Sequence, residues 1–141
     1  MPDKNYELIE HTADIGIKVR GSDLKELFQN ASLAMFDIIA QKIKETTSSK
    51  IKEFHIIQEA ACLDELFVNW LNELLSLAAA KQVVFYDFKF STLNKTKLEA
   101  VALAFDNKEY KTNAEIKAAT YHELMFTKSK SQWLAQVIFD V

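Results

Sequence analysis

Residues 10–16 gather side chains that could bind a metal ion, immediately before a stretch that reads as a strand. The segment is Glu-His-Thr-Ala-Asp-Ile-Gly, with three side chains that can ionise and one hydroxyl. Asp14 stands where the segment meets the strand, and a carboxylate at that junction could reach a hard cation. The alternative is a polar turn in which Asp14 caps backbone amides. The spacing alone leaves both interpretations open.

Residues 137–141 form a second candidate metal site. The side chain of Asp140 and the carbonyl region of Val141, which forms the α-carboxylate, place several oxygen atoms within two residues. Such oxygens suit Ca²⁺ or Mg²⁺, and without a cation the like charges would repel one another. The alternative is a solvated strand end that binds nothing. Because Asp14 and Asp140 offer the same chemistry, we expect the two segments to be neighbours in space.

The segment Thr120-Tyr121-His122 is the third candidate. On a strand, His122 could serve as a metal ligand or transfer a proton. The alternative is a half-buried histidine that makes a hydrogen bond, which is also our expectation for His55. Two carboxylates and a histidine would be a minimal set for metal-assisted hydrolysis, so a metal-dependent phosphoryl-transfer or hydrolytic enzyme is one hypothesis. Against it, the sequence offers no second metal constellation and no positively charged phosphate clamp.

Composition excludes several other kinds of site. The two glycines, Gly16 and Gly21, cannot form a phosphate loop or a dinucleotide-binding fingerprint. The single cysteine, Cys62, excludes a cysteine-rich zinc site and an internal disulfide, which is typical of a reducing compartment. The three histidines include no pair with the helical spacing of a zinc hydrolase, and no serine stands in a Gly-x-Ser-x-Gly elbow.

Charge and hydropathy restrict the partners and the compartment. A net charge of −3, with one arginine among 17 basic residues, argues against strong direct binding to nucleic acid. The most apolar run, residues 74–80, is too short to span a bilayer, so we expect no membrane association. Residues 1–4 lack the apolar region of a secretory signal. We therefore expect a cytoplasmic protein.

Two amphipathic helices are predicted to position the candidate segments. Apolar residues recur with a helical period over residues 24–39 and again over residues 63–81. Asp23 and Glu26 have the spacing of a capping box at the start of the first helix. In the second helix, the residues expected to lie in the core are Trp70, Leu71, Leu74 and Leu75.

Most of the remaining sequence reads as strands. Alternating, β-branched or aromatic side chains predict them at residues 15–20, 51–58, 83–90, 97–105, 116–126 and 133–141. Residues 44–50 have the composition of a surface loop. The order of elements favours a single α+β domain over residues 1–141, in which a largely antiparallel or mixed β-sheet packs with the two amphipathic helices.

Four segments, in order along the chain, resemble the archease family. They are residues 10–16, the helix start at residues 24–31, the strand Lys-Ala-Ala-Thr-Tyr-His at residues 117–122, and the closing strand from Trp133 to Asp140 and Val141. The resemblance spans essentially the whole chain, and four matches in order are far more specific than one. One departure is Glu123, because members of the family usually carry glycine after the Thr-Tyr-His segment.

The resemblance implies an archease-like α+β fold and a non-catalytic accessory role. An archease activates the RtcB-type RNA ligase of tRNA splicing by helping it to become guanylylated with GTP and to turn over repeatedly. This protein would therefore act on tRNA and GTP only through the ligase. The alternatives are the metal-dependent enzyme described above and a chaperone-like or RNA-binding module, which the acidic balance disfavours.

The resemblance also implies a bound divalent metal ion. Ca²⁺ is the expected ion, with Mg²⁺ and Mn²⁺ as the alternatives. By resemblance its ligands are Asp14, Asp140 and Val141. Residues that face the ligase or assist the site would be His11, Thr12, Lys117 and His122.

Overall fold

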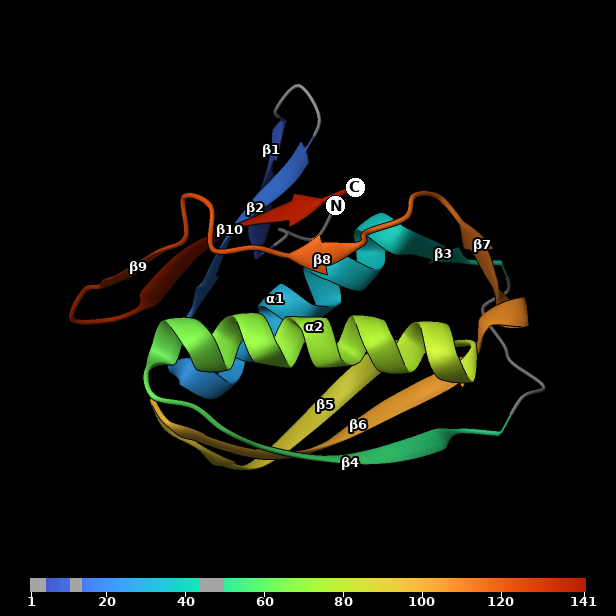
Figure 1. Cartoon of the computed structure of the whole chain (residues 1–141), viewed down its shortest axis with the longest axis horizontal. Helices are drawn as coiled ribbons and strands as arrows, with labels where there is room; N and C mark the ends of the chain where they lie inside the picture. Colours follow the sequence, from blue (N-terminus) through green and yellow to red (C-terminus); the bar gives the residue numbers. More distant parts are fainter. Residues whose placement is uncertain (1–4, 11–13, 44–49) are drawn as a thin grey trace.

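Two helices lie between two β-sheets in the computed structural model (Figure 1). The structure describes residues 5–10, 14–43 and 50–141. The predicted surface loop at residues 44–50 lies outside this description except for Lys50, which is exposed. Neither described helix is long and apolar enough to cross a membrane.

The first sheet is built around β10 (Trp133–Asp140). On one side β10 pairs with β2 (Asp14–Gly21), which pairs in turn with β1 (Tyr6–Glu10). On its other side β10 pairs with β8 (Ala118–Ala119) and with β9 (Met125–Lys128). All of these pairings are antiparallel, so segments from the two ends of the sequence lie side by side at the centre of the sheet.

The second sheet covers the opposite side of the helices (Figure 1). It contains β4 (Lys52–Glu59), β6 (Lys97–Asp106) and β5 (Val83–Leu93), in that order, and its pairings are antiparallel. Two short strands, β3 (Ala40–Lys42) and β7 (Tyr110–Thr112), pair separately, and a 3₁₀ turn at Asn107–Glu109 precedes β7. The predicted α+β class with antiparallel sheets is confirmed.

The predicted strand at residues 116–126 is wrong in its extent. The structure has two short strands here, β8 and β9, separated by a turn in which the Leu124 amide donates to the Tyr121 carbonyl at 3.2 Å. The apolar and aromatic residues of this stretch favour a strand locally. Both short strands nevertheless run in the same direction along β10, and the turn between them shifts the register, because Ala119 is the partner of Phe139 whereas Met125 is the partner of Gln136.

Both helices have the predicted bounds, α1 at Leu24–Ile39 and α2 at Leu63–Lys81. Asp23 caps α1 by accepting a hydrogen bond from the Glu26 amide at 2.8 Å. The Glu26 carboxylate accepts a hydrogen bond from the Ser22 amide at 3.0 Å. In a standard capping box the donor would be the amide of the N-cap residue itself, here Asp23. Helix α2 ends at its C-terminus with the cap residue Gln82, whose left-handed conformation (φ 55°) ends the helical hydrogen bonding.

Gly21 allows β2 to pass directly into α1. A Cβ atom at this position would lie 2.4 Å from the Leu27 nitrogen and 2.7 Å from its Cα. Backbone atoms of a helix cannot move aside as a side chain can, so glycine is required for this close approach. The junction fixes α1 against the first sheet.

Aromatic side chains from both helices and the second sheet form much of the core. Phe28 of α1 meets Phe67 of α2 edge-to-face with ring centroids 5.1 Å apart, and Trp70 lies 5.3 Å from Phe90 of β5. Trp70, Leu71 and Leu74 are fully buried, as predicted. Leu75 is only partly buried and packs at the edge of the core.

One polar bridge crosses this apolar region. The indole N–H of Trp70 donates to the Ser32 hydroxyl at 2.8 Å, and that hydroxyl donates to the Phe28 carbonyl at 2.7 Å. Ser32 is fully buried. The bridge thus satisfies the one polar group of Trp70 and joins α1 to α2.

The Leu74→Ala substitution should destabilise the protein by about 2–5 kcal/mol, because it removes buried methyl groups and leaves a cavity. The free energy of unfolding can be measured by urea titration. Leu8→Ala is the control, since Leu8 is 58% exposed and its truncation should cost little. Equal unfolding midpoints for the two variants would contradict the position of Leu74 in the core.

The Ser32→Ala substitution should cost about 1–3 kcal/mol, because it leaves the buried Trp70 N–H without an acceptor. This cost should appear although alanine is the better helix former. Ser76→Ala, an exposed serine on α2, is the matched control and should leave the unfolding midpoint almost unchanged. A Ser32→Ala protein as stable as the wild type would show that the bridge contributes nothing.

Candidate metal site

Asp14 and Asp140 lie directly opposite each other in the first sheet. β2 begins at Asp14, β10 ends at Asp140, and the antiparallel register makes these two residues partners. Partners of this kind point to the same face, with Cβ atoms about 4.5–5.5 Å apart. Asp140 is exposed and Asp14 is half-buried. The structure therefore brings Asp14 and Asp140 together as neighbours, as their shared chemistry predicted.

The buried neighbours of these residues fix the register. Phe139 and Val137 of β10 are fully buried against the helices, and Ile17, the partner of Val137, is fully buried too. A slip by one residue would turn this apolar set toward solvent, so the pairing is strongly specified. Side chains alternate along a strand, so Asp140 points to the face opposite Phe139.

Next to the carboxylates, Ile138 lies over Gly16 on the outer face of the first sheet. The two residues are partners in the register, and a Cβ on Gly16 would lie 2.5 Å from the Ile138 Cδ1 and 3.3 Å from the Ile9 Cβ. Ile138 is only 1% exposed. The glycine of the opening motif thus makes room for an apolar side chain beside the carboxylate pair.

The segment leading into β8 flanks Asp140 on its other side. The Lys117 amide donates to the Asp140 carbonyl at 2.7 Å. The amide and the hydroxyl of Thr120 both donate to the Ile138 carbonyl, at 3.0 and 2.8 Å. Lys117 and His122 are exposed. We call the group formed by Asp14, Lys117, Asp140 and Val141 the tip.

Two amide side chains hold this segment in place. Asn72 of α2 donates from its Nδ2 to the Ala119 carbonyl at 3.1 Å and accepts from the Ala119 amide at 2.8 Å. Gln136 of β10 donates to the Glu123 carbonyl at 2.9 Å. Sequence reasoning missed both residues, because a carboxamide in a helix or a strand carries no signal of the backbone it will meet.

Glu123 adopts a left-handed conformation (φ 52°) in the turn between β8 and β9. Glycine adopts this conformation without a steric penalty, which gives a physical reason for the glycine that the archease resemblance leads one to expect here. In this chain a glutamate occupies the left-handed position instead of glycine. In the same turn, partial desolvation and then the nearby Glu65 raise the pKa of the largely exposed Tyr121 phenol.

Both histidines that the structure describes, His55 and His122, are exposed to solvent. His122 is exposed, and its amide donates to the Thr120 hydroxyl at 3.3 Å. The expectation of a half-buried His55 is wrong, because β4 is at the edge of the second sheet and His55 points to solvent while Ile56 points inward. His11 and Thr12 lie outside the described residues.

Within the described residues, no group of three or more His, Cys, Asp or Glu side chains could hold a metal ion. The tip offers the side-chain carboxylates of Asp14 and Asp140, together with main-chain oxygens. An ion bound there would therefore take its remaining ligands from the main chain or from water, as Ca²⁺ does readily.

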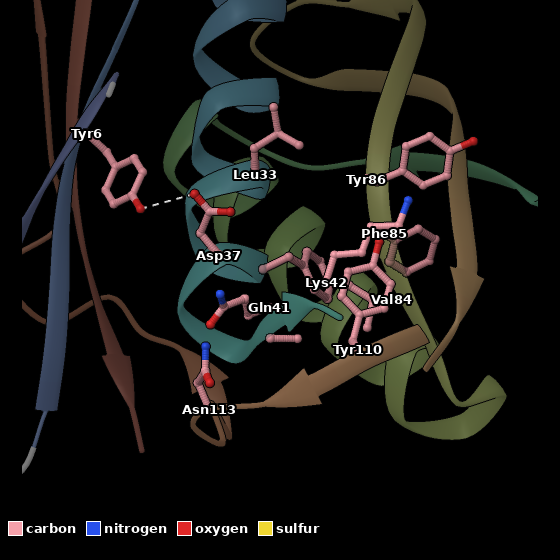
Figure 2. Close-up of a pocket in the computed structure, with 12 residues that line it drawn as sticks. Tyr6, Leu33, Asp37, Gln41, Lys42, Val84, Phe85, Tyr86, Tyr110 and Asn113 are labelled. Atoms are coloured by element: carbon pink, nitrogen blue, oxygen red, sulfur yellow. Dashed lines mark hydrogen bonds between the residues drawn. The ribbon is translucent and has the colours of Figure 1, made fainter. Parts of the chain in front are cut away.

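A separate pocket of about 450 Å³ opens beside the end of α1 (Figure 2). Asp37 and Gln41 lie along one wall, and the Tyr6 hydroxyl donates to the Asp37 carboxylate at 3.2 Å. Tyr110 lines the pocket too, and its pKa is raised by burial and then by Tyr86 and Glu109. None of the tip residues lines this pocket, so it is a distinct feature.

Comparison with known proteins gives consistent matches along the chain. The model of the archease protein family matches residues 6–141. The archease of Methanosarcina barkeri is 36% identical over 146 residues, an alignment that covers 98% of this chain and 97% of that protein. The archease of Pyrococcus abyssi is 32% identical over 144 residues, covering 98% of this chain and 99% of that protein.

Solved structures share the fold. A solution structure of a Methanobacterium thermoautotrophicum protein matches with a TM-score of 0.77 at 29% identity, covering 99% of this chain and 100% of that one. A crystal structure from Thermotoga maritima, described as an archease and possible chaperone, matches with a TM-score of 0.64 at 25% identity and covers 94% of each chain.

The conformation of Glu123 predicts a difference between two substitutions. Glu123→Gly and Glu123→Ala remove the same charged group, so the contacts of the glutamate cancel in the comparison. Glycine should be the more stable by about 1 kcal/mol, because alanine retains the steric cost of the left-handed region. Urea unfolding of both variants measures this difference. Equal stabilities would mean that the turn relaxes to another conformation.

Proposed function

The chain belongs to the archease protein family, and on that basis we propose that it is a metal-binding accessory protein that activates an RtcB-type RNA ligase. In this role it promotes the GTP-dependent guanylylation of the ligase and its repeated turnover. The protein catalyses no step itself, and it acts on tRNA and GTP through the ligase alone.

The pairing of Asp14 with Asp140 is the observation that carries this proposal. Like charges directly opposite each other destabilise a sheet, and a bound cation would remove that cost. The proposed ligands are the two carboxylates and a main-chain oxygen of Val141, a residue that is 37% exposed. Oxygen ligands suit a hard cation, and Ca²⁺ accepts backbone oxygens and water in irregular geometry more readily than Mg²⁺ does.

Exposed side chains along the segment that follows β8 favour contact with another protein. Tyr121 is 57% exposed and Met125 is 51% exposed, on the turn and the strand that follow β8. Tyrosine and methionine are enriched at protein interfaces. Lys117, whose main chain is bonded to that of Asp140, is one exposed positive charge in the tip, and a single charge falls short of the phosphate clamp that a phosphoryl-transfer enzyme needs.

The proposed mechanism places the tip at the nucleotide pocket of the ligase during guanylylation. When bound, the metal ion would supply positive charge toward the nucleotide phosphates. Asp14 and Asp140 would hold the ion at the end of the sheet. The Lys117 amide, which donates to the Asp140 carbonyl, would help to hold the main chain of Asp140 in position.

Asp14→Asn and Asp140→Asn should each abolish the stimulation of ligase guanylylation while the protein stays folded. Each change removes one negative charge from the ligand set, so Ca²⁺ affinity should fall on the order of tenfold or more. Labelling of the ligase with GTP measures stimulation, calorimetry with CaCl₂ measures affinity, and circular dichroism checks the fold.

Glu99→Gln makes the same chemical change on the exposed face of the second sheet and should behave as the wild type. If both aspartate variants are folded and stimulate the ligase fully, the metal tip is not the mechanism. An assay of GTP and RNA with this protein alone tests the alternative class, since turnover without the ligase would indicate an enzyme.

A further inference from the structure

The side chain of Asn72 makes the two hydrogen bonds to the backbone of Ala119 that a neighbouring strand would otherwise make. Its carboxamide donates to the carbonyl and accepts from the amide of the same residue, at 3.1 and 2.8 Å. A carboxamide is suited to this, because it carries a donor and an acceptor side by side. Both main-chain groups of Ala119 are thereby satisfied by helix α2.

The position of Asn72 within α2 is not explained by the needs of the helix. The residue is partly buried between the buried Leu71 and Leu74 on one side and the solvent on the other. Asparagine is a poor helix former in a helix interior, where alanine or leucine would be preferred. The residue is well explained by its contact with Ala119.

The contact continues from Ala119 to the tip. Ala119 is the register partner of Phe139, and Ala118 is the partner of Asp140. Two residues before Ala119, the Lys117 amide donates to the Asp140 carbonyl at 2.7 Å. A strand of two residues has little pairing of its own, so its place depends on what holds its other edge.

We infer that Asn72 is a positioning residue for the tip, because it anchors β8 to α2 and thereby fixes the main chain of Lys117 beside that of Asp140. This inference rests on the proposed function, because its consequence is measured as Ca²⁺ affinity at the tip. Asn72 is not one of the proposed metal ligands. It acts through the backbone of Ala119.

The test compares Asn72→Ala with Asn69→Ala. Asn69 is an exposed asparagine one turn earlier on the same helix. Its main-chain carbonyl accepts a hydrogen bond from the Gln58 side chain at 3.2 Å, and Asn69→Ala keeps this carbonyl. Amide hydrogen exchange at Ala119 and Lys117 should become about tenfold faster in Asn72→Ala alone, while the core amide of Val137 stays protected. Asn72→Leu, a second variant with high helix propensity, should behave in the same way.

Calorimetry with CaCl₂ alone provides the functional readout. Asn72→Ala should weaken Ca²⁺ binding about three- to tenfold at unchanged melting temperature, and Asn69→Ala should not. Because coupling between two sites is reciprocal, CaCl₂ should slow exchange at Ala119 in the wild type by a similar factor, and should do so less in Asn72→Ala.

Two failures can be told apart. If the wild type binds Ca²⁺ and stimulates the ligase, but folded Asn72→Ala and Asn72→Leu bind Ca²⁺ equally well, the positioning role is wrong and the proposed function stands. If the wild type neither binds Ca²⁺ nor stimulates the ligase, the proposed function fails and the inference falls with it.

Discussion

The antiparallel pairing of β2 with β10 joins a segment near the start of the sequence to one at its end. Contacts so distant along the chain carry a cost in conformational entropy that must be offset by what they bury. The buried side chains Ile17, Val19, Ala135, Val137 and Phe139 supply that burial on the face toward the helices. The same register sets Asp14 opposite Asp140. The packing of one face therefore determines the chemistry offered at the end of the pair.

Two glycines of β2 allow the neighbouring elements to approach this pair closely. Gly21 lets β2 enter α1 without a clash against the helix backbone, and Gly16 leaves room for Ile138 beside the carboxylates. Each glycine belongs to β2 and each meets a different element. The geometry of the tip is thus connected to α1 at one end of β2 and to β10 at the other.

Helix α2 packs into the core on one side and holds β8 on another. Its apolar stripe packs into the core, where the Trp70 indole is satisfied by Ser32 of α1. Its polar side meets β8 through Asn72. Rigid elements hold functional groups more accurately than loops do. A helix fixed by a large core is therefore a suitable anchor for a two-residue strand that lies beside Asp140.

The sequence by itself determined the helices, the longest strands (β2, β4, β5, β6 and β10), the antiparallel α+β class and the identity of the candidate carboxylates, but it did not indicate β1, β3 or β7. Hydrophobic periodicity is a local property, so the ends of α1 and α2 could be predicted, whereas residues 116–126 were assigned to one strand although the chain turns at Tyr121–Leu124. Only the tertiary structure decided the register that makes Asp14 and Asp140 partners, the exposure of His55 at a sheet edge, and the roles of Asn72 and Gln136. These features depend on which backbone groups meet across elements, and a side chain's own type and spacing carry no record of a partner that folding brings from elsewhere in the chain.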